Sequence, residues 1–169
     1  MEQYTKSYYF EKLKKYFYIE REVKGTHFSN KTMIIDAIIK PIDMTMWKNK
    51  NVAFGIEFKD TQMLSRTFDT KNYTKWLAQS TDYANTEWNN YGYIYILVCP
   101  SISQLLPCSV TESYNFTAHL LAQLGIGELQ ELERHGLTIV LNQTHKIWSE
   151  TDGVKEGQRY NLQRKFGAR

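Results

Sequence analysis

The sequence predicts a single α/β domain, and three segments carry that prediction. Residues 33–39 form an apolar run around one aspartate, residues 52–59 alternate between apolar and small or charged side chains, and residues 72–84 repeat apolar positions at helical spacing. A run with apolar residues at both parities is typical of a strand covered on both faces, and alternation is typical of a half-buried strand. The resulting element order is helix, three strands, helix and strand.

Local pattern defines the expected elements one by one. In chain order they are a helix from Glu2 to Phe17, strands from Tyr18 to Lys24, Lys31 to Lys40 and Val52 to Lys59, a helix from Asn72 to Ala84, and a strand from Tyr91 to Val98. The helix between the last two strands is compatible with a parallel connection.

The pattern after Pro100 is weaker. It predicts helices from Ser113 to Leu124 and from Gly127 to His135, strands at Leu137 to Leu141 and Lys146 to Trp148, and a turn at 142–145. Residues 150–169 are mostly polar and contain three glycines, so they are expected to form a flexible tail.

Composition agrees with one globular domain spanning residues 1–169. The hydrophobic content of 42% is sufficient for a core and excludes a disordered chain. No apolar run approaches the ~18 to 20 residues that a membrane span requires, and the N-terminus lacks a signal-peptide apolar region. The protein is therefore expected in the cytoplasm, without membrane association. Cys99 and Cys108 fit neither a disulfide framework nor a zinc site.

Asp36 is the one charged residue in its apolar segment, and an ionised carboxylate there needs a cation beside it. Leaving it unpaired would cost on the order of several kcal/mol. Alternation places Glu57 and Lys59 on the same strand face as the small residue Gly55. Asp36, Glu57 and the backbone carbonyl of Phe58 would supply hard oxygen ligands to Mg²⁺ or Mn²⁺. Lys59 would then activate the attacking water and stabilise charge on a phosphate.

In these residues the chain resembles the PD-(D/E)xK nuclease superfamily, which builds a metal-dependent phosphodiesterase site from an Asp on one strand and (Asp/Glu)-x-Lys on the next. Asp36, Glu57 and Lys59 match in type and order, although Ile35 stands where the name of the motif has proline. The resemblance implies a restriction-endonuclease-like core, with a mixed central sheet flanked by helices.

A second motif lies on the helix expected at 72–84. Gln79 and Tyr83 are four residues apart and therefore share one helix face. This pair resembles the Gln-x-x-x-Tyr of the exonuclease-like branch, which includes the RecB nuclease domain, lambda exonuclease and Cas4. The resemblance implies that Gln79 holds the catalytic lysine or a water and that Tyr83 contacts the DNA backbone. An acid on the first helix often completes such sites; the candidate metal ligand is Glu11, with Glu20 and Glu22 as alternatives.

Charge adds candidates for DNA binding. A net charge of +3 excludes a strongly basic nucleic-acid coat protein, but the basic residues are clustered. Besides Tyr83, the candidates are Lys12, Lys15, Lys48 and Lys50. Positive charge near two carboxylates would attract the phosphates of a substrate. The alternative is that these lysines are ordinary solvated residues.

Each motif alone has an ordinary structural explanation, but their combination in this order favours a nuclease. The sequence thus predicts a Mg²⁺-dependent, exonuclease-like deoxyribonuclease that uses Asp36, Glu57, Lys59, Gln79 and Tyr83. DNA is the expected partner, and a homo-oligomer or a larger nucleoprotein assembly is compatible with the small size. Two alternatives remain open. One is a structure- or site-specific endonuclease of the same fold, and the other is a non-catalytic regulator or inhibitor that binds nucleic acid or a protein complex.

Overall fold

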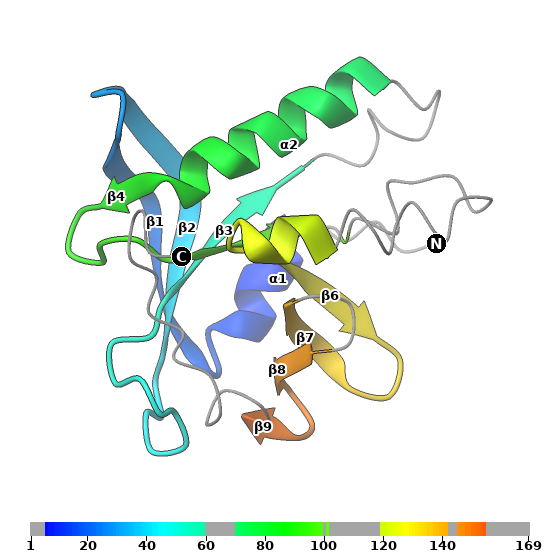
Figure 1. The fold of residues 1–169 in the computed structure, drawn as a ribbon. Coiled ribbons are helices and arrows are strands. Elements are labelled where there is room, and N and C mark those ends of the chain that lie inside the picture. The colour runs from blue at the N-terminus through cyan, green and yellow to red at the C-terminus, as the bar shows by residue number, and fades with distance from the viewer. Residues whose placement is uncertain (1–5, 60–69, 100, 102–118, 142–144, 155–169) are drawn as a thin grey trace.

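The computed structural model describes residues 6–59, 70–99, 101, 119–141 and 145–154 (Figure 1). The elements in these ranges are α1 (Lys6–Leu13), β1 (Phe17–His27), β2 (Thr32–Pro41), β3 (Phe54–Phe58), α2 (Thr70–Ala84), β4 (Thr86–Trp88), β5 (Tyr95–Cys99), β6 (Ile126–Leu132), β7 (Gly136–Leu141), β8 (His145–Ser149) and β9 (Gly153–Val154). Neither α1 nor α2, nor any other helix in the described ranges, is long and apolar enough to cross a membrane.

The nine strands of the described ranges form one mixed sheet, in the order β4-β1-β2-β3-β5-β6-β7-β8-β9. β1, β2 and β3 make an antiparallel meander, and β3, β5 and β6 run parallel. β6 to β9 make a second antiparallel meander. Because parallel neighbours need a crossover, α2 connects β3 to β5. The carboxyl ends of these two strands consequently lie side by side, with Phe58 paired to Cys99.

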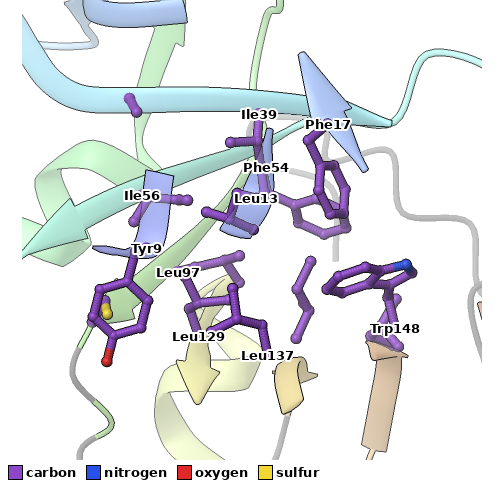
Figure 2. Packing of buried hydrophobic residues seen from close by; sticks show 14 of the residues in the cluster. Tyr9, Leu13, Phe17, Ile39, Phe54, Ile56, Leu97, Leu129, Leu137 and Trp148 are labelled. Carbon is purple, nitrogen blue, oxygen red and sulfur yellow. The ribbon is translucent and has the colours of Figure 1, made fainter. Parts of the chain in front are cut away.

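The sheet curls into a half-barrel with α1 on its concave face. The rings of Phe17 in β1 and Trp148 in β8 have centroids 4.8 Å apart, although β1 is second and β8 eighth in the strand order. Figure 1 shows α1 between β1 and β2 on one side and β6 to β8 on the other. In the close-up of Figure 2, Leu13 of α1 lies beside Phe54 and Ile56 of β3. Twist accumulated over many strands produces this shape.

Buried apolar side chains form one core on each face of the sheet. The α1-side core consists of Tyr9, Phe10, Leu13, Phe17, Ala37, Ile39, Trp47, Val52, Phe54, Ile56, Phe58, Leu97, Cys99, Leu129, Leu137, Ile139, Leu141, Ile147 and Trp148. The α2-side core consists of Val23, Ile35, Ile38, Ala53, Trp76, Tyr83, Ala84, Trp88, Ile94, Ile96, Val98, Leu121 and Ile126. The predicted alternation along β3 is confirmed, because Phe54, Ile56 and Phe58 belong to the first core and Ala53 to the second.

The predicted fold class is wrong. The sequence predicts a restriction-endonuclease-like α/β core with a sheet flanked by helices, whereas the structure is mostly a curled mixed sheet with few, short helices. The difference arises after residue 125, where the chain supplies β6 to β9 and carries the sheet around α1. Curvature depends on contacts between strands that are distant in sequence, such as Phe17 with Trp148, and local pattern does not reveal them.

Before residue 100 the predicted elements agree in kind with the structure and differ at their ends. The first helix, expected to reach Phe17, ends at Leu13, because Phe17 already pairs with Pro41 in the sheet. Residues 2–5 of that helix lie outside the described residues. β4 is a strand that the sequence did not predict; it continues from α2 and pairs with β1.

After residue 100 the agreement is poorer. The helix expected at 127–135 is wrong, because most of this segment belongs to β6 and pairs with β7. Residues 119–123 are helical, and residues 113–118 of the expected helix lie outside the described residues. Within the expected tail, β9 pairs with β8, and residues 155–169 lie outside the described ranges.

Candidate active site

The candidate site lies where β2 and β3 separate. Their ladder pairs Ala37 with Ile56, and continuing this register by one residue would place Asp36 opposite Glu57. At this point the backbone N–H of Phe58 donates to the Asp36 side chain and not to a backbone carbonyl of β2, and Phe58 N lies 2.8 Å from Asp36 Oδ2. The Asp36 carboxylate therefore fills the fork between the two strands and is fixed by the backbone of β3.

A bend in the first hairpin brings Asp36 to this position. Ile35 lies in the α2-side core and Ala37 in the α1-side core, although residues two apart in a regular strand share a face. The opposite position on β1 is Glu22, whose φ of 52° is unusual for a residue other than glycine. The alternation of β2 side chains between the two faces of the sheet is therefore interrupted at Asp36. The Asp36 carboxylate stays half-buried between the two cores.

Four of the predicted residues form one chain of hydrogen bonds. The ammonium of Lys59 donates to Glu57 Oε1 and to Gln79 Oε1, each 2.6 Å away. Gln79 Nε2 donates to the hydroxyl of Tyr83 over 2.8 Å. The Tyr83 hydroxyl in turn donates to the carbonyl of Ile34, also over 2.8 Å. The chain links β3 through α2 to β2, next to Asp36.

The amphipathic pattern of α2 explains how Gln79 and Tyr83 reach the site. Trp76 and Tyr83 are buried in the α2-side core, while Gln79 is half-buried at its border. Residues at i and i+4 lie on one face, so the apolar anchors of the helix fix where the amide points. Lys59 is positioned from the other side, because its backbone N–H donates to the carbonyl of Cys99 in β5 over 2.8 Å.

Burial and charge both act on the carboxyl group of Glu57, which is 5% exposed. Burial raises its pKa above the usual range, Lys59 counteracts this, and the negative charge of Asp36 raises it further. Burial also raises the pKa of Tyr83, to which Glu57 and Asp36 add. The tyrosine hydroxyl therefore remains protonated and able to donate at neutral pH.

Asp36 and Glu57 fit a hard divalent cation. Burial is the main cause of the raised pKa of Glu57, and the negative charge of Asp36 adds to it; a cation bound between the two carboxylates would offset both effects, and carboxylate oxygens are the ligands that Mg²⁺ prefers. Phe58, whose carbonyl is the third predicted ligand, is held beside them by its own N–H. No group of three or more His, Cys, Asp or Glu side chains suited to a metal occurs in the described part of the chain.

The predicted acid on the first helix does not join the site. Glu11 is exposed and pairs with Lys14 on the same helix. Of the two alternatives, Glu20 accepts a hydrogen bond from the hydroxyl of Tyr91 at 2.6 Å, and Glu22 is exposed at the bend of β1. None of the three has a contact with Asp36 or Glu57 among the hydrogen bonds and ion pairs of the described residues.

The candidate DNA-binding lysines are also spread out. Lys12 pairs with Glu131 at 2.5 Å, and Lys50 donates to the carbonyl of Met44 at 2.8 Å. Lys15 and Lys48 are exposed. Lys12 is therefore already neutralised, whereas Lys15 and Lys48 are accessible to a phosphate.

Lys6 is a site residue that the sequence did not reveal. Its ammonium lies 2.7 Å from Asp36 Oδ1, where it forms an ion pair across 30 positions of the chain. A lysine near the start of a helix carries no signal of its own. Packing of α1 against β3, where the rings of Tyr9 and Phe10 contact that of Phe58, brings Lys6 to Asp36.

Comparison with protein-family models, curated proteins and solved structures gave no match to this chain.

Proposed function

We propose that the protein is a metal-dependent nuclease that hydrolyses phosphodiester bonds in DNA. The observation that carries the proposal is the position of Lys59, whose ammonium is held by Glu57 and Gln79 in a site that also contains Asp36. A buried carboxylate with a raised pKa, a fixed cation and an organising amide together are more typical of a catalytic site than of a structural ion pair. The same residues match the nuclease motif in type and order.

Each residue of the site has its own role in the proposed reaction. Asp36 and Glu57 would hold Mg²⁺ or Mn²⁺, which when bound supplies Lewis-acid stabilisation of charge on the phosphate and activates water. Lys59 would hold the attacking water and stabilise negative charge that develops on the phosphate. Gln79, which accepts a hydrogen bond from Lys59, and Tyr83, which accepts one from Gln79, would act as positioning residues for Lys59. Tyr83 is 5% exposed and donates to a backbone carbonyl, so its predicted contact with DNA has less support than its role in the chain of hydrogen bonds.

The proposal is tested by digestion of DNA with purified protein in Mg²⁺, Mn²⁺ or EDTA. Linear duplex, covalently closed circular duplex and single strands are the substrates. We expect metal-dependent cleavage that falls by about a hundredfold or more in Lys59→Met, because fixed charge stabilisation at a reacting group is typically worth that much. Asp36→Asn and Glu57→Gln should show losses at least as large. The matched control is Lys40→Met, which removes an exposed lysine from the end of β2.

The substrates also separate the kinds of nuclease. Sparing of the closed circle would identify an exonuclease, whereas cutting of the circle would identify an endonuclease. If the folded wild type cuts none of the substrates, or if Lys59→Met cuts as well as Lys40→Met, the catalytic assignment is wrong. Binding of DNA without cleavage would then favour a non-catalytic regulator.

A further inference from the structure

Lys6 occupies one oxygen of Asp36, and the other oxygen is taken by the backbone. Lys6 Nζ lies 2.7 Å from Oδ1, and Phe58 N lies 2.8 Å from Oδ2. The Lys6 ammonium also lies 5.9 Å from the centroid of the Phe58 ring. Phe58 is part of the β3 ladder and keeps its hydrogen bond to Oδ2, so Oδ1 is the oxygen of Asp36 whose present partner can leave.

The Lys6 side chain can be displaced, in contrast to Lys59. In its ion pair the side chain of Lys6 is 55% exposed, whereas that of Lys59 is 26% exposed and has two acceptors. An exposed lysine pair contributes little to stability, because it loses side-chain entropy and competes with water. Lys6 can therefore turn into solvent at small cost, while Asp36 stays fixed on Phe58.

From this geometry we infer that Lys6 is an internal counter-cation of Asp36, which must leave Oδ1 before a divalent cation binds there. Two positive charges on one carboxylate oxygen repel each other, so occupancy by Lys6 and by Mg²⁺ or Mn²⁺ exclude one another. Lys6 thereby weakens the apparent metal affinity and sets the metal concentration at which the site fills. The inference rests on the proposed function, because it assumes that Asp36 is a metal ligand.

The test is direct titration of metal-free protein with MnCl₂ by isothermal calorimetry. We compare the wild type, Lys6→Met, Lys6→Arg and Lys14→Met, each checked for folding by circular dichroism. Lys6→Met should bind Mn²⁺ about two- to fivefold more tightly, the factor that corresponds to releasing an exposed ion pair. Lys6→Arg keeps the competing charge and should resemble the wild type. Lys14→Met is the matched control. Lys14 is also an exposed lysine of the N-terminal segment, but its ion-pair partner is Glu11 and not Asp36.

The outcomes separate the inference from the proposed function. Equal Mn²⁺ affinity of the wild type and Lys6→Met, for binding that Asp36→Asn abolishes, would overturn the role of Lys6 and leave the metal site intact. Weaker binding by Lys6→Met would also overturn it, since Lys6 would then support the site. An equal gain in Mn²⁺ affinity in Lys14→Met would overturn it as well, because the gain would then come from the lower net charge and not from the release of Asp36. Absence of Mn²⁺ binding in every folded variant would overturn both the inference and the metal-dependent function.

Discussion

The carboxylate of Glu57 is unfavourable for folding but suited to the proposed metal binding. It is buried, and its ion pair with Lys59 does not fully offset the loss of hydration, since the net effect is a raised pKa. A neutral side chain of the same shape would suit the folded structure better. A carboxylate at this position is therefore consistent with selection for chemistry at some expense of stability.

Glu57→Gln should stabilise the metal-free protein at neutral pH while abolishing cleavage. In the folded state the pKa of Glu57 lies above its ordinary value of 4.5. The contribution of Glu57 to the stability of the wild type is therefore largest below that value and falls as pH rises through the folded pKa. We expect a gain of about 1 kcal/mol for the variant at pH 8, in the usual range for such replacements, and almost none at pH 4.

Urea denaturation in EDTA at the two pH values measures this difference. A variant that is less stable than the wild type at pH 8 would show that the ion pair with Lys59 outweighs burial. Glu87→Gln is the matched control, because it makes the same replacement at an exposed position of β4.

Among single residues, the sequence was most informative where a side chain contradicted its surroundings. Asp36 in an apolar run and Glu57 beside Gly55 stand out without any structure, and the structure brings them together with Lys59, Gln79 and Tyr83. Their catalytic roles stay predictions. Lys6 has no such contrast with its neighbours, so nothing in the sequence separates it from other surface lysines.

Among the elements, β6 is a segment whose pairing with neighbouring strands outweighs its local preference for a helix. The segment 127–135 is rich in Glu, Leu and Gln, which favour helices, yet Ile126 to Glu128 pair in parallel with β5, and the next residues pair antiparallel with β7. Gly127 is the residue in this segment that indicates a strand. Glycine inside a strand often marks a close approach of another chain segment.

Gly127→Ala should destabilise the protein more than Gly55→Ala. A Cβ at 127 would lie 2.7 Å from the carbonyl oxygen of Val140, which belongs to the backbone of β7 and cannot yield easily. A Cβ at 55 would approach Ile35 and Ile96 only at the flexible ends of their side chains, at 2.6 and 2.8 Å. We expect a loss of about 2 to 3 kcal/mol at 127 and about 1 kcal/mol at 55, within the range for overpacked cores.

Chemical denaturation of the two variants measures both losses. Comparable losses at the two positions would mean that β7 adjusts to the added methyl group as readily as the isoleucine side chains do.

For the whole molecule, Lys12 joins the concave side of the sheet to the helix inside it. Its ammonium lies 2.5 Å from Glu131 at the end of β6 and 3.4 Å from Glu150 after β8. Burial alone would lower the pKa of Lys12, but its hydrogen bonds to Glu131 and Tyr8 raise it above the usual range. Its charge is thus part of the fold and contributes little to the field around the molecule.

Lys12→Met should therefore weaken folding without changing the salt dependence of DNA binding. We expect a loss of about 1 to 3 kcal/mol in stability, between the values for exposed and buried ion pairs. If the protein binds DNA as proposed, the slope of log K against log salt should stay at the wild-type value, because each phosphate contact contributes about 0.9 to it and Lys12 is held by Glu131 and Glu150. Binding of a labelled duplex across a range of NaCl concentrations, together with urea denaturation, measures both quantities.

Lys15→Met is the comparison variant for this experiment. Lys15 is exposed on the segment between α1 and β1, and loss of a phosphate contact there would reduce the slope by about one. A reduced slope in Lys12→Met would contradict the assignment of Lys12 to the fold.

The parallel pairing of β3 with β5 also determines how much of the chain must be synthesised before the proposed site can assemble. Phe54 and Tyr95, which begin that pairing, are 41 residues apart (95 − 54), and the backbone N–H of Lys59 is held by Cys99. A nascent chain that has emerged from the ribosome as far as residue 94 already carries all five residues of the proposed site, yet it lacks the strand that fixes Lys59. The proposed site can therefore assemble only after β5 has emerged, and a truncated product that ends earlier would contain the motif without the strand that holds Lys59.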